Sequence, residues 1–126
     1  MEKQQIIQLQ MIEQEANQLE QQLKLVEQHI FDMQKLTEGL NELETSDKKE
    51  ILANIGKGIY IPAEIKSKEL IVEIGNKILV KKSIPETKNI IDEQLKRLIE
   101  FKQQIIEKIG EMQEEMNMMI KSEKTR

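Results

Sequence analysis

Residues 56–65, GKGIYIPAEI, are the most diagnostic stretch of this 126-residue chain. Aliphatic side chains occupy alternate positions of its second part, at Ile59, Ile61, Ala63 and Ile65. This period of two, with β-branched residues, predicts a strand, and the glycines before it predict a tight turn. A similar apolar run at 51–55 lies on the other side of the turn, so the sequence predicts a β-hairpin. Pro62 cannot donate a ladder hydrogen bond, so its strand should lie at an edge or carry a bulge.

The alternating pattern repeats directly downstream. Apolar residues lie on both sides of Gly75-Asn76, at Leu70, Val72, Ile74, Ile78 and Val80. Gly and Asn both tolerate positive φ, so this dipeptide predicts a two-residue primed turn. Residues 51–82 are therefore expected to form two hairpins. The earlier Gly56-Lys57-Gly58 is predicted to be a turn rather than a phosphate-binding loop, because such a loop should open a helix.

Long helices are predicted on both sides of the hairpins. Within residues 1–43, apolar side chains recur in alternating steps of three and four from Leu9 to Leu40, and the residues between them are mostly Gln and Glu. This period of about 3.5 residues is the signature of a coiled coil. The same period returns after Pro85 and predicts a second helix over 86–121.

The two apolar seams fit each other if the chain doubles back. Leu9 then faces Met119, and the layers continue inward until Thr37 faces Ile91. A shift by a whole heptad keeps the same phase, so the sequence leaves the register open by multiples of seven residues. The predicted fold class is α+β, with a long antiparallel two-helix coiled coil joined by two β-hairpins in a single domain, residues 1–126.

The four predicted strands are short, rich in isoleucine and open at their edges. Edges of this kind aggregate unless they pair with another strand. Both flanking segments are committed to the helical seam, so no other part of the chain is expected to cover the strands, and we expect them to pair between chains. The predicted subunit-assembly residues are Ile51, Ile55, Ile59, Ile61, Val72, Ile74, Ile78 and Val80.

Apolar residues also gather at the open end of the predicted coiled coil, where the first turns of the first helix lie opposite the last turns of the second. They are Ile6, Ile7, Leu9, Met11, Met112, Met116, Met118, Met119 and Ile120. Seam packing explains those at heptad positions, whereas others, such as Ile7 and Met118, broaden the apolar surface beyond one stripe. Methionine is flexible and polarizable, so it suits a surface that binds many partners. The sequence leaves two interpretations open, packing at the helix ends and promiscuous binding.

Composition argues against several function classes. The net charge of −4 disfavours a nucleic-acid binder. The chain has no cysteine and one histidine, His29, so it offers no thiol nucleophile, no disulfide and too few ligands for zinc. Its serines form no nucleophile–base pair at a suggestive spacing, so we predict no enzyme activity, no metal and no cofactor. No apolar run is long enough to span a membrane and the sequence opens with no signal peptide, so a soluble, cytoplasmic protein is expected.

The order helix, two hairpins, helix resembles prefoldin, and in particular its alpha-class subunit, since the beta class is known for a single hairpin. Residues 56–65 are similar to the first alpha-class hairpin, in which a turn of small residues leads into an aliphatic-aromatic-aliphatic-Pro run. Residues 70–80 are similar to the second hairpin. The resemblance extends over about residues 5–120, and the shortness of the chain favours an archaeal source.

The resemblance implies a hexamer of two alpha and four beta subunits, in which the hairpins form a double β-barrel and the coiled coils project from it. Such a complex captures non-native client proteins without ATP and delivers them to a group II chaperonin. Client binding would then lie at the coiled-coil tips, on the apolar residues gathered there. The sequence also fits an alternative, a structural coiled-coil scaffold or filament-forming protein.

Overall fold

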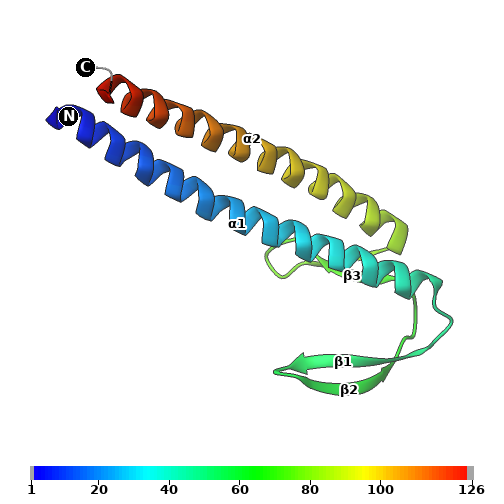
Figure 1. Ribbon diagram of the computed structural model, residues 1–126. Helices are drawn as coiled ribbons and strands as arrows, with labels where there is room; N and C mark the ends of the chain where they lie inside the picture. The colour runs from blue at the N-terminus through cyan, green and yellow to red at the C-terminus, as the bar shows by residue number, and fades with distance from the viewer. Residues whose placement is uncertain (1, 125–126) are drawn as a thin grey trace. The chain divides into compact units, whose positions relative to one another are not determined.

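A computed structural model of the chain describes residues 2–124 (Figure 1). Two long helices flank two small sheets. The elements in chain order are α1 (Lys3–Thr45), β1 (Glu50–Gly56), β2 (Ile59–Glu64), β3 (Leu70–Glu73), β4 (Leu79–Lys82) and α2 (Ile84–Lys124). β1 pairs with β2 and β3 with β4, both antiparallel, as two separate two-stranded sheets. The predicted α+β class, with two packed helices and two hairpins, is confirmed.

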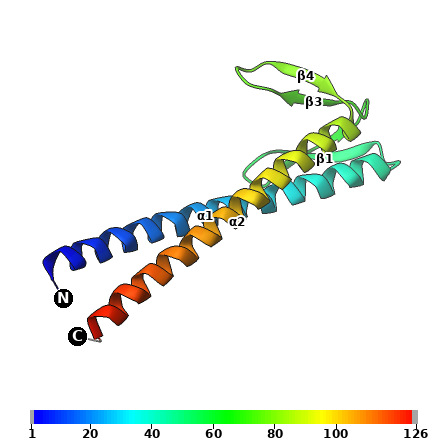
Figure 2. The ribbon, with the colours of Figure 1, turned by 90° about the horizontal axis from the view of Figure 1, so that it is seen from above.

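The chain divides into two compact units. The helical unit joins the part of α1 up to Asp32 to the part of α2 from Gln94 onward. The hairpin unit, Met33–Glu93, holds the C-terminal part of α1, both hairpins and the start of α2. Within the helical unit the two helix segments run antiparallel, so the start of α1 and the end of α2 lie at the same end (Figures 1 and 2).

The predicted seam is the least exposed part of the helical unit. Ala16, Val26, Ile105 and Met112 are buried. Most other seam positions are half-buried, whereas the Gln and Glu residues between them are mostly exposed. This pattern is what two amphipathic helices produce when each buries its apolar stripe against the other.

A shallow groove between the two helix segments shows the register. It is lined by Glu15, Gln18, Leu19, Gln22, Lys108 and Met112. Leu19 therefore lies near Lys108 and Met112, as expected if it faces Ile109. A shift by one heptad would place Leu19 opposite Lys102 or Met116 instead. The structure thus selects one of the registers that the sequence left open.

The hairpin unit has a small apolar core. Leu40, Ile84 and Ile91 are buried together, and Met33, Leu43 and Leu70 pack against them. The cluster contains residues from the end of α1, the start of α2 and the first position of β3. It therefore joins the two helices and the second hairpin within this unit.

Helix α2 begins two residues before its predicted start because Ser83 caps it. The Ser83 hydroxyl accepts a hydrogen bond from the Glu86 amide (3.2 Å) and donates one to the Glu86 carboxylate (3.1 Å). Ser-x-x-Glu is a capping pattern, and it satisfies amides that have no partner inside the helix. Pro85 fits this first turn, where its missing amide proton costs nothing.

The two hairpin turns both use positive φ, but the second is displaced from its predicted position. Lys57 and Gly58 form the first turn with φ of 50° and 76°. In the second, the Ile78 amide donates to the Gly75 carbonyl, and the central residues Asn76 and Lys77 have φ of 48° and 61°. The prediction of a Gly75-Asn76 turn was therefore wrong by one residue. The reason is strand register, because the Ile74 amide donates to the Ile78 carbonyl and leaves three residues between them.

Candidate assembly and client-binding surfaces

The first hairpin has two distinct faces set by its register. Ile51 pairs with Ala63 and Ala53 with Ile61, so these side chains share one face. On the other face Leu52 pairs with Pro62 and Asn54 with Tyr60. A bulge at Ile55 separates Asn54 from Gly56, and the Asn54 side-chain oxygen accepts the Gly56 amide (2.8 Å) across it. Ile55 is therefore an extra residue on β1, and pairing resumes after it between Gly56 and Ile59 beside the turn.

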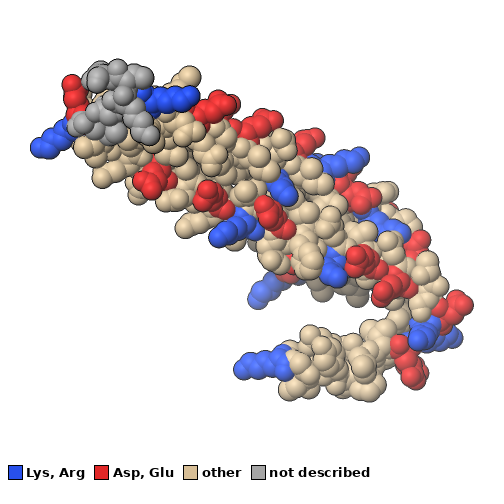
Figure 3. Space-filling view, viewed as in Figure 1, with Lys and Arg blue, Asp and Glu red and all other residues tan. Residues whose placement is uncertain are grey.

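The predicted assembly residues of this hairpin, Ile51, Ile55, Ile59 and Ile61, are all exposed. Residues 51–56 and 59–63 contain no charged side chain. Figure 3 shows the hairpin as an almost continuous uncharged surface, in contrast to the helices with their many charged groups. An apolar surface of this kind is typical of an interaction site rather than of a face that stays in water.

The opposite face of the first hairpin is apolar as well, which the sequence reasoning missed. Leu52 is 68% exposed and Tyr60 is also exposed. The signal was present in the run Ile51-Leu52-Ala53, because uninterrupted apolar strands are typical of sheets covered on both faces. Strict alternation was assumed instead, so only one face was predicted to take part in assembly.

The second hairpin is partly covered by its own chain. Val72 pairs with Val80 and Leu70 with Lys82, so all four share one face. Val72 and Val80 are half-buried, and Leu70 packs on the core of the hairpin unit. The expectation that no other part of the chain covers the strands was therefore wrong for this face. The reason is that β3 begins at Leu70, which packs against the core cluster.

The exposed apolar residues of the second hairpin lie elsewhere. Ile71 and Leu79 are exposed on the opposite face, and neither was predicted. The predicted residues Ile74 and Ile78 flank the turn and are both exposed. The second hairpin thus keeps an apolar surface available, at its turn and on its outer face.

The predicted client-binding residues fall into two groups in the helical unit. Leu9, Met116 and Met119 are half-buried and Met112 is buried, so these four belong to the seam. The remaining residues are exposed, and they are Ile6, Ile7, Met11, Met118 and Ile120. Seam packing accounts for the first group and leaves the second without an internal role. Client binding by the exposed group stays a prediction.

The described residues were also compared with the predictions on metal binding and membrane insertion. Across residues 2–124, no group of three His, Asp or Glu side chains is placed to hold a metal ion. His29 is exposed on α1. In the same range neither helix has a stretch apolar enough to cross a membrane. The arrangement offers apolar surface and strand edges, which suit protein–protein contact.

Comparison with known proteins agrees with this architecture. A family model described as Prefoldin subunit matches residues 12–126. Prefoldin subunit alpha of Methanobrevibacter smithii is 32% identical over 107 residues, which cover 79% of this chain and 73% of the relative. Prefoldin subunit alpha of Archaeoglobus fulgidus is 32% identical over 114 residues, covering 89% and 75% respectively.

A solved structure has the same fold. It is a chain of filamentous PFD from Methanocaldococcus jannaschii, determined by cryo-EM. The two chains superpose with a TM-score of 0.77 at 16% identity, over 89% of this chain and 94% of the other. Since the family model covers most of the sequence and the curated relatives are alpha subunits, the chain belongs to the prefoldin family, as a subunit of its alpha class.

Proposed function

We propose that this chain is the alpha subunit of an ATP-independent holdase that captures non-native proteins and delivers them to a group II chaperonin in the cytoplasm. Membership of the prefoldin family supports a chaperone-type role, because prefoldin is a family of chaperones.

The observation that carries the proposal is the exposed apolar group near the ends of the helical unit. Ile7, Met11 and Met118 are all more than half exposed, and Met118 reaches 72%. A non-native protein presents irregular apolar segments, so its binder needs adaptable apolar area without a shaped pocket. Each contact is weak, about 25 cal/mol per Å² of apolar area buried. Weak contacts can exchange with a competing surface, which permits transfer without nucleotide.

The hairpins would supply the assembly. We propose that their exposed apolar faces and strand edges pair with beta-class prefoldin subunits, two alpha with four beta, to form an intersubunit β-barrel. The exposure of Ile51, Ile59 and Ile61 supports this, because isolated hairpins with such faces are marginal in water. An assembly would also bring several helical units to one client, and multivalent binding strengthens weak contacts through effective concentration.

A matched pair of triple variants tests client capture. The end variant carries Ile7→Gln, Met11→Gln and Met118→Gln, which remove exposed apolar area and leave the seam intact. The control variant carries Leu25→Gln, Ile99→Gln and Ile106→Gln, which remove exposed apolar residues from the middle of the helices. The readout is suppression of aggregation of a chemically denatured enzyme, after sedimentation has verified that both variants assemble.

We expect the end variant to lose most of its protection and the control variant to keep it. Equal protection by the two variants would show that the helix ends are not the capture site. An assembled wild-type protein that forms long fibres and never delays aggregation would instead favour the scaffold alternative.

A further inference from the structure

The C-terminal end of α1 lacks the charges that stabilise helix ends. Carbonyl groups in the last turn carry a partial negative charge that favours nearby cations. The last turn of α1 contains no basic residue and includes Glu42 and Glu44, which have the wrong sign. Some carbonyls have local partners, since the Ser46 amide donates to the Glu42 carbonyl (2.9 Å). A cation from another part of the chain would therefore stabilise this helix end.

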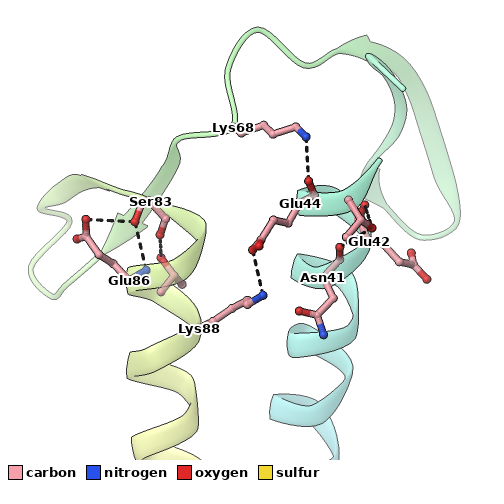
Figure 4. A network of polar contacts seen from close by, with 9 residues as sticks. Asn41, Glu42, Glu44, Lys68, Ser83, Glu86 and Lys88 are labelled. Atoms are coloured by element: carbon pink, nitrogen blue, oxygen red, sulfur yellow. Dashed lines mark hydrogen bonds and ion pairs between the residues drawn. The ribbon is translucent and has the colours of Figure 1, made fainter. Parts of the chain in front are cut away.

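Lys68 supplies that cation from the linker between the two hairpins. Its ammonium donates to the Glu44 carbonyl (3.0 Å) and to the Ser46 carbonyl (3.1 Å). Figure 4 shows Lys68 extending to the end of α1, while Lys88 extends from α2 to the carboxylate of the same Glu44. The Lys88–Glu44 ion pair measures 3.0 Å. Glu44 thus binds the linker through its backbone and α2 through its side chain.

The two hairpins have no ladder hydrogen bond to each other, because they form separate sheets. The linker is held at its two ends. The Ile65 amide donates to the Lys49 carbonyl (2.6 Å) at the base of the first hairpin, and Leu70 packs in the core at the start of the second. Lys68 lies between these anchors and attaches the middle of the linker to α1.

We propose that Lys68 is a positioning residue for subunit assembly, which fixes the two hairpins relative to each other before they meet a neighbouring subunit. This inference rests on the proposed assembly through the hairpins. Ordering a flexible segment on binding lowers affinity, and a segment that is already held avoids that loss. Because one chain presents two apolar hairpins, both can engage together only if their spacing matches the partner surfaces.

The positioning itself can be measured in the full chain without any partner. The sequence has no cysteine, so Lys57→Cys and Lys77→Cys place one spin label at the turn of each hairpin. Electron–electron resonance on labelled chains diluted with unlabelled protein then reports the distribution of distances between the two turns. We expect a narrow distribution in the parent, loss of the narrow peak with Lys68→Met, and its return with Lys68→Arg. The matched control is Lys66→Met, an exposed lysine of the same linker that should leave the distribution narrow.

The consequence for assembly is measured with a beta-class prefoldin subunit by sedimentation. Lys68→Met should weaken association about tenfold, the scale of one charge-assisted hydrogen-bonded side chain, while Lys68→Arg and Lys66→Met keep the parent affinity. A narrow peak that survives Lys68→Met, or a broad parent distribution, would overturn the inference. So would a lost peak with unchanged association. If the parent itself never binds the beta-class subunit, the proposed partner is wrong, and the distance measurement still decides whether Lys68 positions the hairpins.

Discussion

An isoleucine on the seam of the helical unit is buried, whereas the isoleucines of the first hairpin are exposed. Ile105 on α2 is 4% exposed, whereas Ile61 on β2 is 52% exposed. The difference is burial, because the seam of α2 packs against the seam of α1 within the helical unit, whereas Ile61 is not covered by any of the residues that the structure describes. The chain thus buries its helical seam within itself, whereas the apolar side chains of its first hairpin stay exposed. Stability and association should therefore respond to mutations in different regions.

The largest effect on stability is expected in the core of the hairpin unit. Ile91 is 4% exposed and packs with Leu40 and Ile84. Ile91→Ala removes buried methyl groups and leaves a cavity, so the free energy of unfolding should fall by about 2–4 kcal/mol. Urea denaturation at fixed protein concentration, followed by helical circular dichroism, measures the change.

The neighbouring Ile90 is a matched control, because it is 39% exposed on the same turn of α2. Ile90→Ala removes the same atoms from a site that is already in contact with water, so the loss should stay below about 1 kcal/mol. Equal losses at the two positions would mean that the core cluster does not stabilise the unit.

The second prediction reverses the comparison by placing a charge on the first hairpin. Ile61→Lys should leave helicity unchanged and weaken association about a hundredfold or more, because a buried ammonium without a partner is costly. Sedimentation equilibrium gives the association constant. Glu64→Lys introduces the same side chain at the exposed end of the same strand and should preserve association. Oligomers that persist with Ile61→Lys would remove this face from the assembly site.

A third prediction concerns the face of the first hairpin that was not anticipated. If both faces are covered in the assembly, Leu52→Ser should weaken association about tenfold, close to the effect of Ile61→Ser. The two variants differ only in which face they change, since neighbouring residues of a strand point to opposite sides. Unaltered association with Leu52→Ser, measured in the same way, would show that its face stays in water.

The helices and their seam could be predicted because heptad periodicity depends on local sequence. Leu9, Ile91 and Met119 were placed on the seam by spacing alone, and the hairpins were predicted from glycine turns and β-branched alternation. The register between the helices could not be predicted, since every heptad shift preserves the same phase. Selecting it requires tertiary contacts, such as those that bring Leu19 close to Lys108 and Met112 in one groove.

Surface roles were harder to predict for a related reason. Periodicity identifies which residues share a face but does not show what covers that face. Val72 was predicted to contact another subunit, yet it is half-buried within its own chain. The neighbouring Ile71 is exposed but was not among the predicted assembly residues. The Ser83 cap could have been found from its Ser-x-x-Glu pattern. The Lys68 contact could not, because it joins residues more than twenty positions apart.

The fourth prediction tests the start of α2. Ser83→Ala removes the hydroxyl that accepts the Glu86 amide, and loss of such a cap costs about 1 kcal/mol. Thermal unfolding should show a correspondingly lower midpoint, and Ser83→Asn should restore it because Asn also caps helices well. A midpoint that does not change with Ser83→Ala would mean that other contacts fix the start of the helix.

The smallest effect contrasts a helix glycine with a turn glycine. Gly110 lies in the interior of α2, is exposed, and has no atom within 4 Å of the position where a Cβ would be added. Gly110→Ala should therefore stabilise the chain by about 0.5–1 kcal/mol, because alanine restricts the unfolded chain and favours helix. Gly58 has equally open space but a φ of +76°, where a Cβ is strained, so Gly58→Ala should destabilise the hairpin by about 1 kcal/mol. Urea denaturation should show the stabilisation by Gly110→Ala in α2. Hydrogen exchange of the β1–β2 amides should show the destabilisation by Gly58→Ala, which has the opposite sign. If both substitutions stabilise, the positive φ at Gly58 does not determine the stability of the hairpin. The helical unit and the first hairpin would then differ in side-chain burial and not in their tolerance of alanine.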